Sequence, residues 1–127
     1  MNDIDELTYL INGCAMKVHN IMGSGFQEVV YQRCLSIELD RAGIKHKREV
    51  EQTIYYDGIE VGTRRADFVI DDKIIVELKA LPEIENLHIA QIRNYLVAYN
   101  FPIGLLINFG GESLQFKKIY NRKFNHE

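Results

Sequence analysis

Two apolar runs rich in valine and isoleucine lie close together within residues 64–80, separated by Asp71, Asp72 and Lys73. Such runs on either side of a short polar connection predict a β-hairpin. Three charged residues interrupt these runs: Asp67, Glu77 and Lys79. Segments that otherwise resemble core strands therefore carry charged groups, and the register of the hairpin decides where those groups meet.

Side chains alternate along a strand, so Glu77 and Lys79 share one face and lie about 7 Å apart. The apolar residues of the second run take the other face: Ile74, Val76, Leu78 and Ala80. On the first run, Asp67 is out of phase with three apolar residues: Ala66, Phe68 and Ile70. Asp67 joins Glu77 if the two are cross-strand partners, which requires a three-residue connection or a bulge. A two-residue turn would instead place Asp67 opposite Val76.

In the first register, two carboxylates and one ammonium group converge on a half-buried face of the sheet. Carboxylates this close repel each other, which raises the pKa of one of them unless a cation neutralises the pair. Lys79 does part of this, and a divalent metal does it better. Hard oxygen ligands suit Mg²⁺ or Mn²⁺. The alternative is a salt bridge between Lys79 and one carboxylate on an ordinary solvated sheet face.

Length and composition indicate one globular domain over residues 1–127, with 26% charged residues and a net charge of −3. This charge argues against non-specific coating of nucleic acid, although it permits a local basic patch beside a metal site. No run of 18 apolar residues exists that would span a membrane. The acidic start lacks the basic region of a signal peptide, and Cys14 and Cys34 lack metal-type spacing. We therefore expect a cytoplasmic protein with reduced thiols.

Apolar residues at steps of three and four predict a helix over residues 3–22 with one buried stripe: Ile4, Leu7, Ile11, Cys14, Val18 and Ile21. A second helix is expected at about 26–42, with Ser24 and Gln27 as its capping box. Glu28 falls in its first turn, on the stripe that continues with Tyr31. Either Glu28 stabilises the helix dipole without any metal, or it points inward as an additional metal ligand.

Residues 50–56 predict a strand that an Asp57-Gly58 turn joins to a second strand over 59–70. The third strand, 74–80, stops before Pro82. The basic segment 45–48 is interpreted as a solvated loop. Its Lys47 and Arg48, together with Arg64 and Arg65, are able to contact phosphates.

A third helix is predicted over residues 84–99, with His88, Gln91 and Tyr95 together on one face. A glutamine and a tyrosine in such positions serve either as structural hydrogen-bonding groups or in catalysis. Residues 103–109 are apolar on both faces, which predicts a central strand parallel to a neighbour across the helix. Residues 114–119 are expected to form an edge strand or hairpin partner and are one candidate surface for a homodimer.

The spacing of Asp67, Glu77 and Lys79 resembles the signature of the PD-(D/E)XK nuclease superfamily. The predicted order of elements is similar to the α-β-β-β-α-β core of that superfamily, which implies an α/β, restriction-endonuclease-like fold with a mixed central sheet flanked by helices. Its RecB-like members also use a glutamate from the preceding helix and a glutamine and a tyrosine after the hairpin. The matching residues here are Glu28, Gln91 and Tyr95.

The chain also resembles a narrower group, the GxxExxY proteins, over about residues 4–120. Residues 25–31 carry the pattern that names this group, from Gly25 through Glu28 to Tyr31. Further similar blocks lie at 18–20, 65–67, 76–80, 91–96 and 104–110.

These resemblances imply a metal-dependent nuclease, with DNA favoured as the substrate. The implied ligands of Mg²⁺ or Mn²⁺ are Asp67, Glu77, the backbone carbonyl of Leu78 and Glu28. Lys79 would stabilise developing negative charge, and Gln91 would orient water, the lysine or the nucleic acid, with Tyr95 and Tyr31 in support. His19 is a further candidate, and a buried structural histidine is the alternative.

Two other functions compete with this interpretation. One is a non-catalytic module that keeps the nuclease fold and binds nucleic acid or a protein. The other is a small self-associating structural protein in which the charged residues form only salt bridges. An assay with nucleic acid and metal would separate the three. A nuclease cuts in a metal-dependent way, a binding module binds without cutting, and a structural protein does neither.

Overall fold

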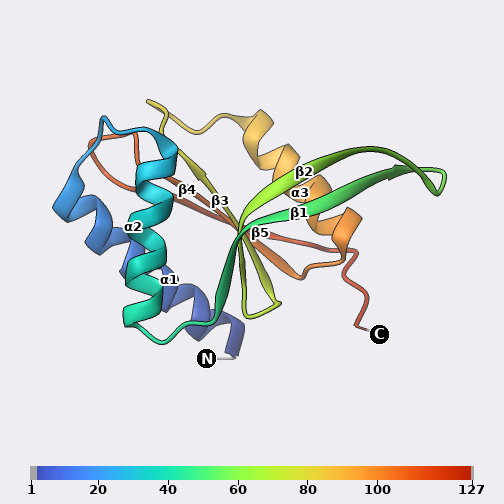
Figure 1. The fold of residues 1–127 in the computed structure, drawn as a ribbon, viewed down its shortest axis with the longest axis horizontal. Coiled ribbons are helices and arrows are strands. Elements are labelled where there is room, and N and C mark those ends of the chain that lie inside the picture. The colour runs from blue at the N-terminus through green and yellow to red at the C-terminus, as the bar shows by residue number, and fades with distance from the viewer. Residues whose placement is uncertain (1–2, 127) are drawn as a thin grey trace.

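The computed structural model describes residues 3–126, so Met1, Asn2 and Glu127 of the predicted single domain lie outside the described residues. The chain forms α1 (Asp3–Met22), α2 (Glu28–Arg41), β1 (His46–Tyr56), β2 (Ile59–Ile70), β3 (Ile74–Lys79), α3 (Asn86–Tyr99), β4 (Ile103–Asn108) and β5 (Gln115–Tyr120) (Figure 1). One sheet contains the strands in the order β1-β2-β3-β4-β5. Only β3 and β4 run parallel; the other neighbours are antiparallel. The predicted α/β fold with a mixed sheet is confirmed.

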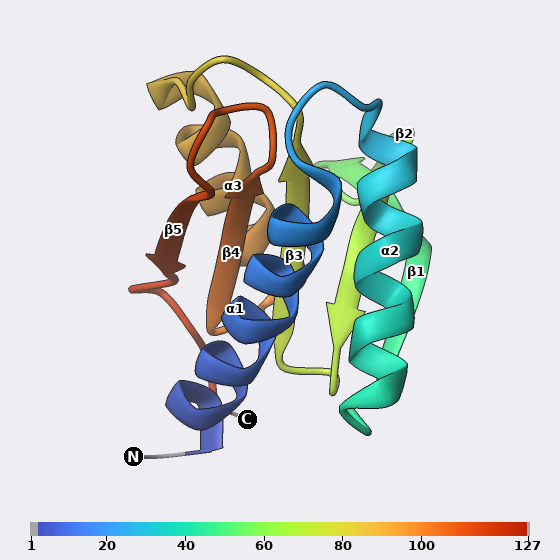
Figure 2. The same cartoon turned by 90° about the vertical axis from the view of Figure 1, so that its left-hand side faces the viewer.

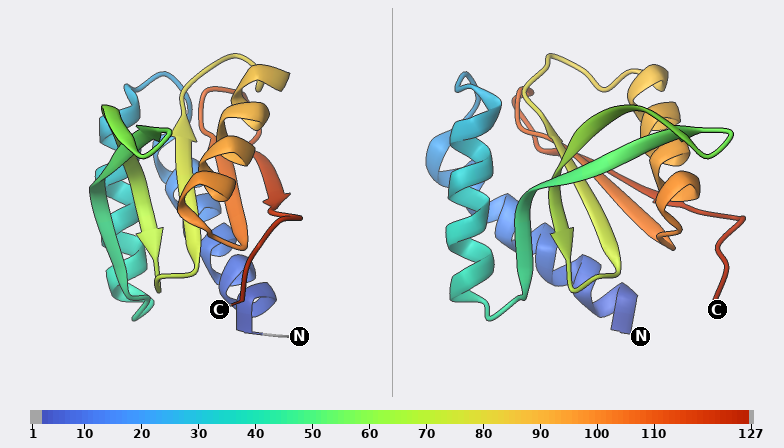
Figure 3. Two further views of the ribbon diagram at one scale, coloured as in Figure 1. Left: turned by 90° about the vertical axis from the view of Figure 1, so that its right-hand side faces the viewer. Right: turned by 45° about the vertical axis from the view of Figure 1, so that its right-hand side comes forward.

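Helices cover the two faces of the sheet unequally. The pair α1 and α2 lies over one face (Figure 2), and α3 lies alone over the other (Figure 3). The larger apolar cluster lies under α1 and α2 and includes Ile11, Leu35 and Phe68, whereas a smaller cluster around Ile92 and Leu96 lies under α3. The single helix leaves room on both of its flanks for polar groups.

The β3–α3–β4 connection confirms the predicted central strand. Every residue of β4 is buried, as expected of a strand covered on both faces. Gly104 allows α3 to approach β4 closely, because a Cβ atom there would lie 2.6 Å from Cγ2 of Ile92. Packing at Gly104 therefore fixes the height of α3 above the sheet.

The predicted buried stripe of α1 is wrong at its last member. Ile21 is 67% exposed, whereas Met22 is half-buried and packs against the core. The stripe chosen from the sequence repeats every 3.5 residues, but a straight helix has 3.6 residues per turn. The stripe therefore drifts by about 20° per heptad, and by the end of α1 it has left the core.

Two other local predictions also differ from the structure. The Ser24–Gln27 capping box does not form: Gln27 is itself the N-cap of α2, and among the described residues no side chain caps that helix end. The basic segment 45–48 is not a loop from His46 onward, because Lys47 and Arg48 pair with Val69 and Phe68 of β2. Strand pairing at the edge of the sheet leaves their side chains exposed, so the charges remain in solvent.

Candidate metal and nucleic-acid site

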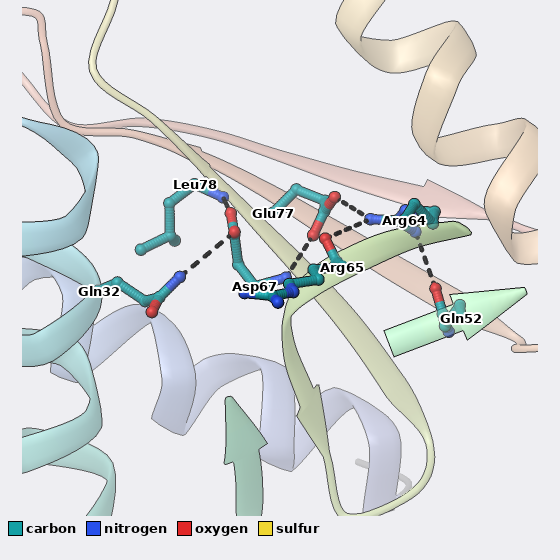
Figure 4. Close-up of polar contacts among 7 residues, drawn as sticks. All are labelled: Gln32, Gln52, Arg64, Arg65, Asp67, Glu77 and Leu78. Carbon is teal, nitrogen blue, oxygen red and sulfur yellow. Dashed lines mark hydrogen bonds and ion pairs between the residues drawn. The ribbon is translucent and has the colours of Figure 1, made fainter. Parts of the chain in front are cut away.

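The β2–β3 hairpin has the three-residue connection that the sequence predicted for pairing Asp67 with Glu77. Its backbone pairs are Ile70↔Ile74, Val69↔Ile75 and Phe68↔Val76, and the next positions along the strands are Asp67 and Glu77. At these positions the hydrogen bonds between the strands run from backbone N–H groups to side-chain carboxylates. The backbone N–H of Asp67 donates to Oε2 of Glu77 at 2.9 Å, and the N–H of Leu78 donates to Oδ2 of Asp67 at 2.8 Å (Figure 4). The two carboxylates therefore bridge the strands where regular pairing ends.

The predicted phase of β2 is wrong at Ala66. Ala66 belongs to the apolar cluster under α3, whereas Phe68 belongs to the cluster under α1 and α2. The strand thus changes phase at Asp67, and Glu49 on the neighbouring strand has a φ of 50°, a conformation uncommon outside glycine. This irregularity lets Asp67 contact α2 while Glu77 contacts groups on the α3 side.

Glu77 is surrounded by cationic and aromatic groups on the α3 side. Its Oε1 forms an ion pair with Arg64, whose side chain is only 9% exposed. The guanidinium of Arg64 lies 3.5 Å from the ring centre of Tyr95 and donates to Oε1 of Gln52 at 3.0 Å. Burial, and next the charge of Asp67, raise the pKa of Glu77 to about 7, although Arg64 opposes the shift. Arg64 therefore neutralises a site carboxylate, and its predicted contact with phosphate stays a prediction.

Asp67 is held from the α2 side by a residue that the sequence analysis missed. Nε2 of Gln32 donates to Oδ1 of Asp67 at 3.3 Å, and Arg48 donates to Oε1 of Gln32 from Nε at 3.2 Å and from Nη2 at 2.8 Å. Burial raises the pKa of Asp67, and the Leu78 N–H and the charge of Lys79 oppose it. The available signal was helical spacing, because Gln32 lies four residues after Glu28 and so on the same face of α2.

Glu28 and Lys79 complete the charged cluster. Glu28 is the first residue of α2, and its pKa is raised by burial and by Asp67, while Lys79 lowers it. Lys79 makes no hydrogen bond or ion pair with any other described residue, yet its charge lowers the pKa of all three carboxyl groups. The cluster therefore combines three carboxylates with Arg64 and Lys79, while Arg65 lines the adjoining cavity and Arg48 reaches Asp67 through Gln32.

The predicted Gln91 and Tyr95 lie beside this cluster. A cavity of about 180 Å³ brings together residues from the hairpin, α3 and β4: Arg64, Arg65, Glu77, Lys79, His88, Gln91, Ile92, Tyr95 and Leu106. Gln91 and Arg65 are exposed at its mouth, and Tyr95 is half-buried. Polar groups that lie far apart in the sequence therefore converge around one opening.

The predicted supporting residues Tyr31 and His19 hold loops and do not line this cavity. Oη of Tyr31 donates to the carbonyl of Gly23 at 2.6 Å and accepts from the N–H of Phe26 at 3.2 Å. Nε2 of His19 lies 3.0 Å from the carbonyl oxygen of Gly111, which fits the structural alternative for this histidine. Tyr31 fixes the loop that leads into Glu28, so its link to the site is indirect.

The donor set suits a hard divalent cation. Within residues 3–126, no group of three or more His, Cys, Asp or Glu side chains is close enough to hold a metal ion. Zn²⁺ sites usually require three or four protein ligands, whereas Mg²⁺ is commonly held by one or two carboxylates and keeps several waters. The carboxylate oxygens of Asp67 and Glu77 therefore fit Mg²⁺ or Mn²⁺.

The mixed sheet and the carboxylate-bearing hairpin define a protein with a restriction-endonuclease-like fold. The chain belongs to the PD-(D/E)XK nuclease superfamily, whose family model matches residues 5–121. Its fold is similar to the crystal structure of SSO0001, with a TM-score of 0.58 and 22% identity over 73% of this chain. The match covers 50% of that protein, so the chain spans about half its length.

None of the curated proteins compared with this sequence matches it. In the described part of the chain, no helix is both long and apolar enough to cross a membrane.

Proposed function

We propose that this protein is a metal-dependent nuclease of the GxxExxY type that hydrolyses phosphodiester bonds, with DNA as the favoured substrate. The observation that carries the proposal is the bridging of β2 and β3 by Asp67 and Glu77, with the ammonium of Lys79 free of any described ion-pair partner. A salt-bridged sheet face would pair Lys79 with one of these carboxylates. Membership of the nuclease superfamily supports the same reaction class.

In this proposal Asp67 and Glu77 hold Mg²⁺ or Mn²⁺, with the carbonyl of Leu78 and Glu28 as additional oxygen donors. When bound, the ion supplies positive charge that polarises the phosphodiester and lowers the pKa of a coordinated water. Arg64 already pairs with Glu77, so ion binding requires Glu77 to share its charge or release the guanidinium.

The chain's own residues act on the charge that develops at phosphorus. The ammonium of Lys79 stabilises the additional negative charge of the transition state, which is the kind of interaction that raises kcat. Gln91, exposed at the mouth of the cavity, orients the attacking water or the substrate backbone. Tyr95 positions Arg64 by stacking under its guanidinium. Arg65, Lys47 and Arg48 are exposed cations available to nearby phosphates.

The test is a cleavage screen with labelled single- and double-stranded DNA and RNA in Mg²⁺ or Mn²⁺. Asp67→Asn keeps an acceptor for the Leu78 N–H but removes the charge, and it should lower cleavage at least about 100-fold. Lys79→Met should have a comparable effect. Lys45→Met, an exposed lysine in the loop before β1, is the matched control and should cut like the wild-type protein.

Two outcomes would contradict the proposal. Cleavage that survives both site substitutions would place the reaction elsewhere or assign it to a contaminant. Binding of nucleic acid without cutting in either metal would favour the non-catalytic binding module. The predicted homodimer through the β5 edge and the cytoplasmic location stay predictions.

A further inference from the structure

A strongly basic groove lies on the side of α3 away from the carboxylates. It has a volume of about 700 Å³ and is formed by α3, β5 and the segment that follows β5. Five of its lining residues are cationic, namely Arg93, Lys117, Lys118, Arg122 and Lys123, but the Lys118 side chain lies on the α1 side of the sheet, where it pairs with Asp5. In the described part of the chain, no acidic residue lines it. Because the whole chain has a net charge of −3, the part outside the other four cations carries −7. Positive charge is therefore concentrated in this groove, although the net charge of the chain is negative.

Most of these cations are not neutralised within the protein. Lys118 forms an ion pair with Asp5 at 2.8 Å, and its ammonium lies 5.4 Å from the ring centre of Tyr120. The other four form no ion pair with a described residue, and all four are exposed. A surface with four unpaired cations and no carboxylate has the charge that an extended polyanion requires.

Helix α3 is the common wall of the groove and the candidate active site. Gln91 and Tyr95 lie on the flank that faces the hairpin, whereas Ile89, Arg93 and Val97 lie on the flank that faces β5. Figure 3 shows α3 between these two parts of the sheet. The helix contains no acidic residue, so a polyanion that crosses it meets no repelling side chain on the way. With its side chains an α-helix is about 10–12 Å across, which is about three nucleotides at 3.4 Å per step along one strand.

We propose that the α3–β5 groove binds the phosphate backbone of a nucleic acid about three nucleotides away from the phosphodiester held at Asp67 and Glu77. The placement relative to the cut rests on the proposed function, whereas binding in the groove does not. Phosphates of one strand pair with Arg93, Lys117, Arg122 and Lys123. The concave shape of the groove, which a flat bilayer surface cannot fill, favours a nucleic acid over a membrane surface.

The binding test uses a fluorescently labelled 20-base-pair DNA duplex and the matching single strand, in EDTA so that no cutting occurs. The variant Arg93→Gln/Lys117→Gln/Arg122→Gln should raise Kd at least about tenfold at low salt. It should also reduce the slope of log Kd against log salt by about 2 to 3, since each neutralised phosphate contributes about 0.9. In Mg²⁺, cleavage by the wild-type protein should require a strand that extends about three nucleotides beyond the cut, whereas the groove variant should lose this length requirement.

The matched control removes the same charge from elsewhere: Arg33→Gln on α2, Lys45→Gln after α2 and Lys73→Gln in the turn between β2 and β3, none of which pairs with a buried carboxylate among the described residues. The inference is overturned if this control weakens DNA binding as much as the groove variant. It is also overturned if other polyanions compete for the groove as well as unlabelled DNA does. The competitors are poly-glutamate at equal charge concentration and vesicles that contain anionic lipid.

The result separates the two proposals. If the wild-type protein cuts DNA and the groove variant binds DNA normally, the groove inference fails and the nuclease proposal stands. If the groove variant loses binding while the wild-type protein cuts nothing in either metal, groove binding stands and the nuclease proposal fails. Urea unfolding of all variants confirms that exposed substitutions leave the fold intact.

Discussion

The face of the sheet under α1 and α2 and the face under α3 differ in what they bury. Two helices cover the first face, and fully buried side chains such as Leu35, Leu39 and Phe68 fill the space beneath them. One helix covers the second face, where Ile92 and Leu96 form a smaller core. Both flanks of that helix are lined by charged groups, with Glu77, Arg64 and Lys79 on one side and the basic groove on the other. The first face supplies most of the buried apolar area, and the second leaves polar groups accessible.

This difference explains how a small domain tolerates an unfavourable cluster of charges. Burial of carboxylates raises their pKa values and costs folding free energy, which apolar burial elsewhere must offset. The site is placed at the boundary where β2 leaves the well-packed sheet, with Gln32 of α2 and Arg64 of β2 supplying hydrogen bonds and charge. Three substitutions test whether the two faces are separable in this way.

The largest effect on stability is expected from Leu35→Ala on the face under α1 and α2. Removing a fully buried leucine side chain should lower the free energy of unfolding by about 2–5 kcal/mol, because the cavity closes only partly. Cleavage per folded molecule, measured well below the melting temperature, should be unchanged. The matched variant Leu96→Ala should cost a similar free energy but also reduce cleavage, since it loosens α3. Equal effects of the two variants on cleavage would break the distinction between the faces.

The next effect is a pH dependence of stability in the metal-free protein. The pKa of Glu77 is raised from 4.5 to about 7 in the folded state, so the folded state binds this proton more tightly than the unfolded chain. The resulting stabilisation is full below about pH 4.5 and is lost as the pH rises through about 7. Glu77→Gln should remove this loss, which amounts to at most about 3 kcal/mol.

Urea unfolding at pH 5 and pH 8 in EDTA measures this difference. Glu60→Gln, which removes an exposed carboxyl group from the same hairpin arm, is the control and should keep the wild-type pH dependence. A Glu77→Gln protein that loses as much stability between the two pH values as the wild-type protein would show that Glu77 is not the group responsible.

The smallest effect is expected from Tyr31→Phe, in the core under α1 and α2. The ring stays stacked on Phe109, with ring centres 4.6 Å apart, but the hydrogen bonds to Gly23 and Phe26 are lost. Stability should fall by about 1–2 kcal/mol, and cleavage should fall a few-fold because the loop before Glu28 loosens. Tyr9→Phe, at an exposed position of α1, should change neither quantity. A larger loss of cleavage would mean that Tyr31 acts on the site more directly than its contacts indicate.

Much of the fold followed from local patterns. The alternation of residues 64–80 predicted the hairpin and left two registers open, and the pairs of β2 and β3 select the one that brings Asp67 opposite Glu77. The two-sided apolar run at 103–109 predicted a central parallel strand, and β4 is one. The sequence patterns failed in two situations: where a small error in the assumed helical period adds up along a helix, and where a strand is irregular. Ile21 lies at the end of a drifting stripe, and Ala66 lies where β2 changes phase.

The sequence by itself determined the elements and their order and limited the hairpin to two registers, because periodicity and turn length act between residues that are neighbours along the chain. Only the tertiary structure decided that Gln32 reaches Asp67, that Arg64 lies against Glu77 over Tyr95, and that four cations gather beside α3. These contacts depend on how α2 and α3 pack across the sheet. Helix packing is set by side-chain shape and by close approaches such as that at Gly104, which no local pattern in the sequence specifies.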